Sequence, residues 1–83
     1  PTLINVRQKY QIAAERPLIL TLSRLAYEKD IDRLISVLPQ VCQTQPKVLL
    51  MIVGDGPARE ALEKQVTDLN LQEHVIFTGE IAN

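Results

Sequence analysis

Apolar residues gather in three short runs along this chain, at 18–22, 48–53 and 75–77. The first two runs are largely continuous instead of alternating with polar positions. A short continuous apolar run is typical of a strand that is covered on both faces, as in a parallel sheet. The pattern therefore predicts three β-strands, of which the first two lie in a buried sheet.

The two stretches between these runs carry apolar residues at steps of three and four, the spacing of one face of an α-helix. The residues that share this spacing are Ile31, Leu34, Ile35, Leu38, Val41 and Cys42 in the first stretch, and Ala58, Ala61, Leu62, Val66 and Leu69 in the second. In the second stretch, the charged residues Glu60, Glu63, Lys64 and Asp68 are expected to face outward. We therefore predict two amphipathic helices that alternate with the three strands.

Several residues predict where the helices begin and end. Asp30 is placed to cap the first helix, and Gly56-Pro57 is expected to open the second, because proline is tolerated in a first helical turn. Asn70 is suited to a left-handed stop after the second helix. Pro39 lies within the first pattern, which continues beyond it, so we expect a kink there and not an end. A further short helix is expected from Leu3 to Tyr10.

The predicted order β-α-β-α-β indicates an α/β fold, a Rossmann-like three-layer half-domain with a parallel core. Right-handed crossovers place both helices on one face of the sheet. The other face is then left in need of cover. The 83 residues have room for a single core, so we treat residues 1–83 as one partial domain.

Composition and charge exclude several classes of protein. With 46% hydrophobic residues and a formal net charge of −1, the chain is globular and not disordered. It carries no field that would attract nucleic acid, and its longest apolar run is far shorter than a membrane span. The single cysteine, Cys42, excludes an internal disulfide and a cysteine metal cluster. A reducing, cytoplasmic setting fits this composition.

Candidate chemistry lies in the loops that follow the strands, because ligands of open α/β sheets bind outside the carboxyl ends of the strands. The first such loop contains Arg24 and Lys29, just before a helix N-terminus. Arginine can grip phosphate oxygens in a fork, while lysine acts as a point charge. The loop is therefore a candidate diphosphate site. The alternative is that both cations are solvated surface residues, with Lys29 paired to Glu28 or Asp32.

The other two loops contain glycines at which backbone could approach a ligand closely, namely Gly54, Gly56 and Gly79. The sequence Gly54-Asp55-Gly56-Pro57 matches neither the dinucleotide-binding nor the P-loop motif, and a purely structural turn explains it equally well. Asp55 could accept a bond from a sugar hydroxyl, but a helix-capping role is favoured. His74 precedes the third strand and is expected at the opposite edge of the sheet. We expect no metal site.

Three segments together resemble glycosyltransferase family 4. Residues 20–35 resemble its "GRL-xx-EKG-idxLI" segment, residues 53–62 its "vGdGpxrexL" segment, and residues 75–79 its "ViFtG" strand. The order and the intervals agree from about Val6 to Gly79. Two positions depart from the family pattern: Ser23 stands where glycine is frequent, and Asp30 replaces the glycine after Glu-Lys. A carboxylate at residue 30 competes with phosphate for the same helix N–H groups.

The resemblance implies part of the C-terminal, donor-binding domain of a retaining GT-B glycosyltransferase. Such an enzyme transfers a hexose from a nucleoside diphosphate-sugar, by default a UDP-sugar, to a lipid, glycan or other acceptor, usually without a metal or other cofactor. Arg24 and Lys29 would then bind the donor diphosphate and stabilise the leaving group. The resemblance also implies an acceptor-binding N-terminal domain and a downstream acidic motif that this chain lacks. We therefore expect the 83 residues alone to transfer no sugar.

Two further expectations concern the cell and the class of protein. The resemblance implies a cytoplasmic parent enzyme, peripheral to the membrane if its acceptor is a lipid. The alternative, from a different class, is a non-catalytic flavodoxin-like module for binding or regulation. A receiver of that kind needs clustered acidic residues at the strand ends, where this chain instead carries Arg24 and Lys29, with Asp55 as a lone carboxylate.

Overall fold

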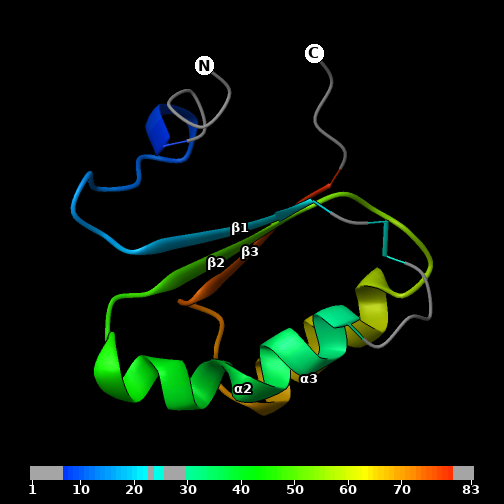
Figure 1. Ribbon diagram of the computed structural model, residues 1–83. Helices are drawn as coiled ribbons and strands as arrows, with labels where there is room; N and C mark the ends of the chain where they lie inside the picture. The colour runs from blue at the N-terminus through cyan, green and yellow to red at the C-terminus, as the bar shows by residue number, and fades with distance from the viewer. Residues whose placement is uncertain (1–6, 23, 26–29, 80–83) are drawn as a thin grey trace.

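The computed structural model describes residues 7–22, 24–25 and 30–79. The elements alternate as predicted, in the order β1 (Leu18–Leu22), α2 (Asp30–Thr44), β2 (Leu49–Val53), α3 (Arg59–Asp68) and β3 (Val75–Gly79). The strands form one parallel sheet in the order β1-β2-β3. Both helices cover the same face of this sheet (Figure 1). The prediction of an α/β, Rossmann-like arrangement is therefore confirmed.

The main core fills the space between the sheet and the two helices. It combines Leu50 and Ile52 of β2 with Ile35 of α2 and Leu62 of α3. All five residues of β2 are buried, which explains why this strand is a continuous apolar run: it is the middle strand and has neighbours on both sides. The outer strand β1 is only half-buried, and its last residue, Leu22, is 76% exposed.

The second face of the sheet is covered in part by the N-terminal segment, the blue segment on the far side of the sheet from the helices in Figure 1. Tyr10 and Ile12 pack against Met51 and Val53 there. Of the short helix expected from Leu3 to Tyr10, residues 7–9 are helical, and residues 3–6 lie outside the described residues. This segment is the described part of the third layer.

The helix boundaries agree with the sequence at three points and differ at one. Helix α2 begins at Asp30 and continues through Pro39 to Thr44, while a capping role of Asp30 and a kink at Pro39 stay predictions. Asn70 adopts φ 58°, the left-handed stop that was predicted after α3. Helix α3, however, begins at Arg59, while residues 57–58 form a turn. The expectation that Gly56-Pro57 opens this helix is therefore wrong, because the helix begins two residues after Pro57.

The amino edge of the sheet is held together by Arg16. Its Nε donates to the carbonyl oxygen of Lys47 at 2.6 Å, and its Nη2 donates to that of Glu73 at 2.8 Å. These carbonyls belong to the turns that precede β2 and β3. His74 lies at the same edge, with Nδ1 2.9 Å from the carbonyl oxygen of Val48. Its predicted position, away from the carboxyl edge, is confirmed.

Replacing Arg16 with alanine should lower the free energy of unfolding by about 1.5–2 kcal/mol. This is the lower part of the range for hydrogen bonds to a charged donor, because water can reach both carbonyls once the guanidinium is gone. Urea unfolding followed by circular dichroism would measure the change. Arg33→Ala removes an exposed arginine from α2 and serves as the control. Equal unfolding midpoints for the two variants would contradict the structural role of Arg16.

Candidate functional site

The described residues of the three segments singled out from the sequence meet at the carboxyl edge of the sheet, where backbone hydrogen bonds join them. The N–H of Leu25, after β1, donates to the carbonyl oxygen of Asp55 at 3.1 Å, and the N–H of Ala58 donates back to the carbonyl oxygen of Leu25 at 2.8 Å. The N–H of Gly54 donates to the carbonyl oxygen of Gly79 at 2.9 Å. Among the described residues, 24–25 after β1, 54–58 after β2 and Gly79 at the end of β3 thus form one connected surface.

Arg24 lies on this connected surface and is exposed to solvent. It directly precedes Leu25, which is only 1% exposed. The fold therefore places Arg24 at the edge of the sheet where ligands of open α/β folds bind. Lys29, the second predicted cation, lies outside the described residues, as do Ser23, Tyr27 and Glu28. The predicted pairing of Arg24 with Lys29 across a ligand stays a prediction.

The glycines predicted to approach a ligand use their backbone groups within the chain. Gly54 adopts φ 136° and bonds to Gly79, whose φ is 71°. Both lie in the left-handed half of conformational space that favours glycine. The N–H of Gly56 donates to Oδ1 of Asp55 at 2.8 Å. These three residues shape the carboxyl edge, and contact with a ligand stays a prediction for each.

A small irregularity in the sheet lies next to these glycines. The pairing of β2 with β3 shifts after Ile52, so that Val53 pairs with Gly79 and Thr78 has no partner in the ladder. The hydroxyl of Thr78 lies 3.3 Å from the carbonyl oxygen of Ile52 and 2.9 Å from that of Gly79. This bulge turns the end of β3 toward Gly54, since bulges bend the strand that carries them.

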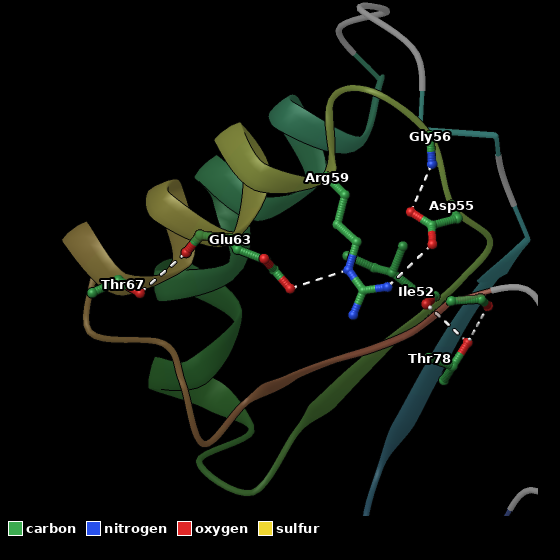
Figure 2. Close-up of polar contacts among 8 residues, drawn as sticks. Ile52, Asp55, Gly56, Arg59, Glu63, Thr67 and Thr78 are labelled. Carbon is green, nitrogen blue, oxygen red and sulfur yellow. Dashed lines mark hydrogen bonds and ion pairs between the residues drawn. The ribbon is translucent and has the colours of Figure 1, made fainter.

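Asp55 is the first in a row of three linked charged side chains along the start of α3, shown in Figure 2. Its Oδ2 lies 3.3 Å from Nη1 of Arg59, and Nε of Arg59 lies 3.1 Å from Oε2 of Glu63. Helix α3 has Ala58 at its N-cap position and no side-chain cap. The expectation that Asp55 caps the helix is therefore wrong, because its carboxylate instead binds the N–H of Gly56 and the guanidinium of Arg59.

Arg59 was not singled out from the sequence, yet its side chain contacts the loop after β2, helix α3 and strand β3. Its guanidinium carbon lies 5.9 Å from the centre of the Phe77 ring, and Nη1 would lie 3.3 Å from a Cβ at Gly79. The hydrogen bond to Glu63, together with the charges of Glu63 and Asp55, raises the pKa of the Arg59 guanidinium above its ordinary value. The i,i+4 spacing of opposite charges was the available signal.

Two sulfur-containing residues, Met51 and Cys42, contribute to the packing of the fold. Met51 is fully buried in β2, within the run 48–53 that was predicted as a buried strand, and Cys42 packs at the margin of the main core. Within residues 7–22, 24–25 and 30–79, the side chains of His, Cys, Asp and Glu form no group of three or more that could hold a metal ion. No helix in this part of the chain is long and apolar enough to cross a bilayer.

Comparison with solved structures supports the same fold. The chain superimposes on S. aureus TarM, solved with Fondaparinux, alpha-GlcNAc-glycerol and UDP, with a TM-score of 0.74 and 29% identity over 80% of this chain and 13% of TarM. It superimposes on the pneumococcal O-GlcNAc transferase GtfA, solved with UDP and GlcNAc, with a TM-score of 0.73 and 25% identity over 87% of this chain and 14% of GtfA.

Comparison with curated sequences identifies the family of this chain. A GDP-mannose-dependent alpha-(1-6)-phosphatidylinositol monomannoside mannosyltransferase of Mycolicibacterium smegmatis is 41% identical over 89% of this chain and 19% of its own length. The alpha-monoglucosyldiacylglycerol synthase of Streptococcus pneumoniae is 39% identical over 94% of this chain and 18% of its own length. The chain thus spans about a fifth of these curated relatives. Residues 4–83 match the model of the family described as "Glycosyl transferases group 1", and the chain belongs to this family.

Proposed function

We propose that this chain is part of the donor-binding domain of a retaining glycosyltransferase, in which Arg24 and Lys29 bind the diphosphate of a nucleotide-sugar. The observation that carries the proposal is the place of Arg24. It is exposed at the carboxyl edge of a parallel sheet, next to a buried leucine that two backbone hydrogen bonds fasten to the loop after β2. A cation on a fixed backbone at that edge suits an anionic ligand.

The helix ends favour side chains over backbone as the phosphate ligands. At the start of α3, the N–H groups of Ala58 and Arg59 already donate to Leu25 and Gly56. The first turn of α2 carries two carboxylates, Asp30 and Asp32, which oppose the attraction of that helix end for an anion. The positive charge that a diphosphate needs therefore comes from the side chains of Arg24 and Lys29.

The proposed chemistry follows from charge. When the bond between the sugar and the donor diphosphate breaks, negative charge builds up on the leaving nucleoside diphosphate. Cations fixed beside it stabilise that charge more in the transition state than in the bound donor, and so they accelerate transfer. Each charge-assisted contact contributes about 1.5–3 kcal/mol. No metal or other cofactor is part of this proposal.

The relatives support a nucleotide donor and leave its base open. One relative is named for GDP-mannose, and two structural neighbours were solved with UDP. We propose a UDP-sugar as donor. Two relatives are named for lipids that contain inositol or diacylglycerol, so we propose a cytoplasmic enzyme that meets a lipid acceptor at the membrane surface. The acceptor domain would belong to the remainder of the protein.

Calorimetric titration of the full-length transferase would test the proposal. UDP should bind at least tenfold more tightly than UMP, because the second phosphate adds a charge-assisted contact and about 1.4 kcal/mol corresponds to tenfold in affinity. GDP and GMP titrated in parallel would identify the base. Equal affinities for monophosphate and diphosphate would contradict the role of the cations. Absence of binding by any nucleotide would favour the flavodoxin-like alternative.

A further inference from the structure

The backbone of Leu25 is docked on the turn between β2 and α3, residues 54–58, which we call the β2–α3 turn. Both of its backbone polar groups are used: its N–H donates to Asp55 at 3.1 Å, and its carbonyl oxygen accepts from Ala58 at 2.8 Å. The Leu25 side chain is part of the main core. Leu25, which directly follows Arg24, is thus fixed by two backbone hydrogen bonds and by the packing of its side chain.

Gly56 makes this docking possible because it has no side chain. A Cβ at residue 56 would lie 2.2 Å from the carbonyl oxygen of Leu25, 2.6 Å from its carbonyl carbon and 3.0 Å from its nitrogen. All three atoms are backbone, so no side-chain rotation can relieve the overlap. Unlike Gly54 and Gly79, Gly56 does not have a positive φ. Glycine is needed at residue 56 because there is no space for a side chain, and not because the backbone conformation is unusual.

We propose that Gly56 is a positioning residue for the diphosphate site, because it fixes the backbone that carries Arg24. The inference rests on the proposed function of Arg24 and gives Gly56 a role that does not require contact with the ligand. A side chain at residue 56 would push the Leu25 backbone away by about 1 Å before ordinary contact is restored. Displacements of about 1 Å in groups that bind a transition state can cost a hundredfold in rate.

A double-mutant cycle in the full-length transferase separates positioning from a general loss of structure. The variants are Gly56→Ala, Arg24→Ala and the two combined, with kcat/KM for the donor as readout. Gly56→Ala should lower kcat/KM at least tenfold when Arg24 is present and less than threefold when Arg24 is already alanine. Residues that act through one another give such non-additive effects, whereas independent ones add.

Two further variants keep the test decisive. Val48→Ala truncates a buried residue that precedes β2, at the amino edge, and should change kcat/KM equally in both backgrounds. Ala58→Pro removes the N–H group that donates a hydrogen bond to the carbonyl oxygen of Leu25, while Gly56 stays in place. If Gly56→Ala does not fold, Ala58→Pro should show the same non-additive pattern. Equal losses from Gly56→Ala and Ala58→Pro with and without Arg24 would overturn the positioning role. An unchanged kcat/KM in Arg24→Ala alone would instead overturn the proposed function.

Discussion

Reversing the charge of Arg24 and Lys29 together, with Arg24→Glu and Lys29→Glu, should lower kcat/KM for the donor more than a hundredfold. Two charge-assisted contacts of about 1.5–3 kcal/mol each are lost, and two carboxylates then repel the diphosphate. Since about 1.4 kcal/mol corresponds to tenfold, the lost contacts alone account for a hundredfold. Steady-state kinetics with varied donor and saturating acceptor would measure the change.

The control for this charge reversal is Lys47→Glu combined with Lys64→Glu. It changes the net charge by the same amount, and both lysines are exposed. Lys47 lies before β2 at the amino edge, and Lys64 lies within α3, where it pairs with Asp68. We expect kcat/KM to stay within threefold of the unmodified enzyme. If both double variants lost activity equally, the effect would be one of overall charge, and the assignment of Arg24 and Lys29 would be wrong.

Leu50→Ala should lower the free energy of unfolding of the chain by about 2–5 kcal/mol, the usual cost of truncating a buried leucine. Leu50 lies in the middle of β2, is 0% exposed, and belongs to the core between sheet and helices. Domains have only about 5–15 kcal/mol of stability in total. A loss of this size therefore removes a large share of it. Urea unfolding followed by circular dichroism would give the value.

Leu22→Ala is the matched control, because it makes the same chemical change at the exposed end of β1. Substitutions on the surface usually change stability by less than about 0.5 kcal/mol. The two variants therefore differ only in burial. Similar losses in both would mean that the face of the sheet toward the helices is not where the stability of this domain resides.

The strands and their order were predictable because burial leaves a strong trace in sequence. A middle strand covered on both faces has to be apolar at every position, and residues 49–53 are. Asn70 was predictable as a helix stop because few other residues adopt a positive φ. The start of α3 was not predictable, because Gly56-Pro57 suits a helix opening locally. The turn continues to Ala58, whose N–H donates to Leu25, a partner far away in sequence.

The place of the candidate residue Arg24 was predictable from the sequence, whereas the roles of the neighbouring Gly56 and Asp55 were not. The rule that ligands bind at the carboxyl edge placed Arg24 there from the sequence, and the fold agrees. The sequence could not distinguish a glycine that admits a ligand from one that admits a neighbouring backbone. At Gly56 the neighbour is Leu25. Likewise, Asp55 looked like a cap until the structure placed Arg59 and Glu63 along one line with it.

The exposed leucine at the end of β1 has a practical consequence for handling the 83-residue chain. Apolar side chains that face water add to the surface through which copies can associate, and a net charge near zero provides little repulsion to oppose it. The chain carries a formal charge of −1 with a sequence pI of about 5.7. Purification at mildly alkaline pH, where the copies repel one another more strongly, would favour a clear and monodisperse solution.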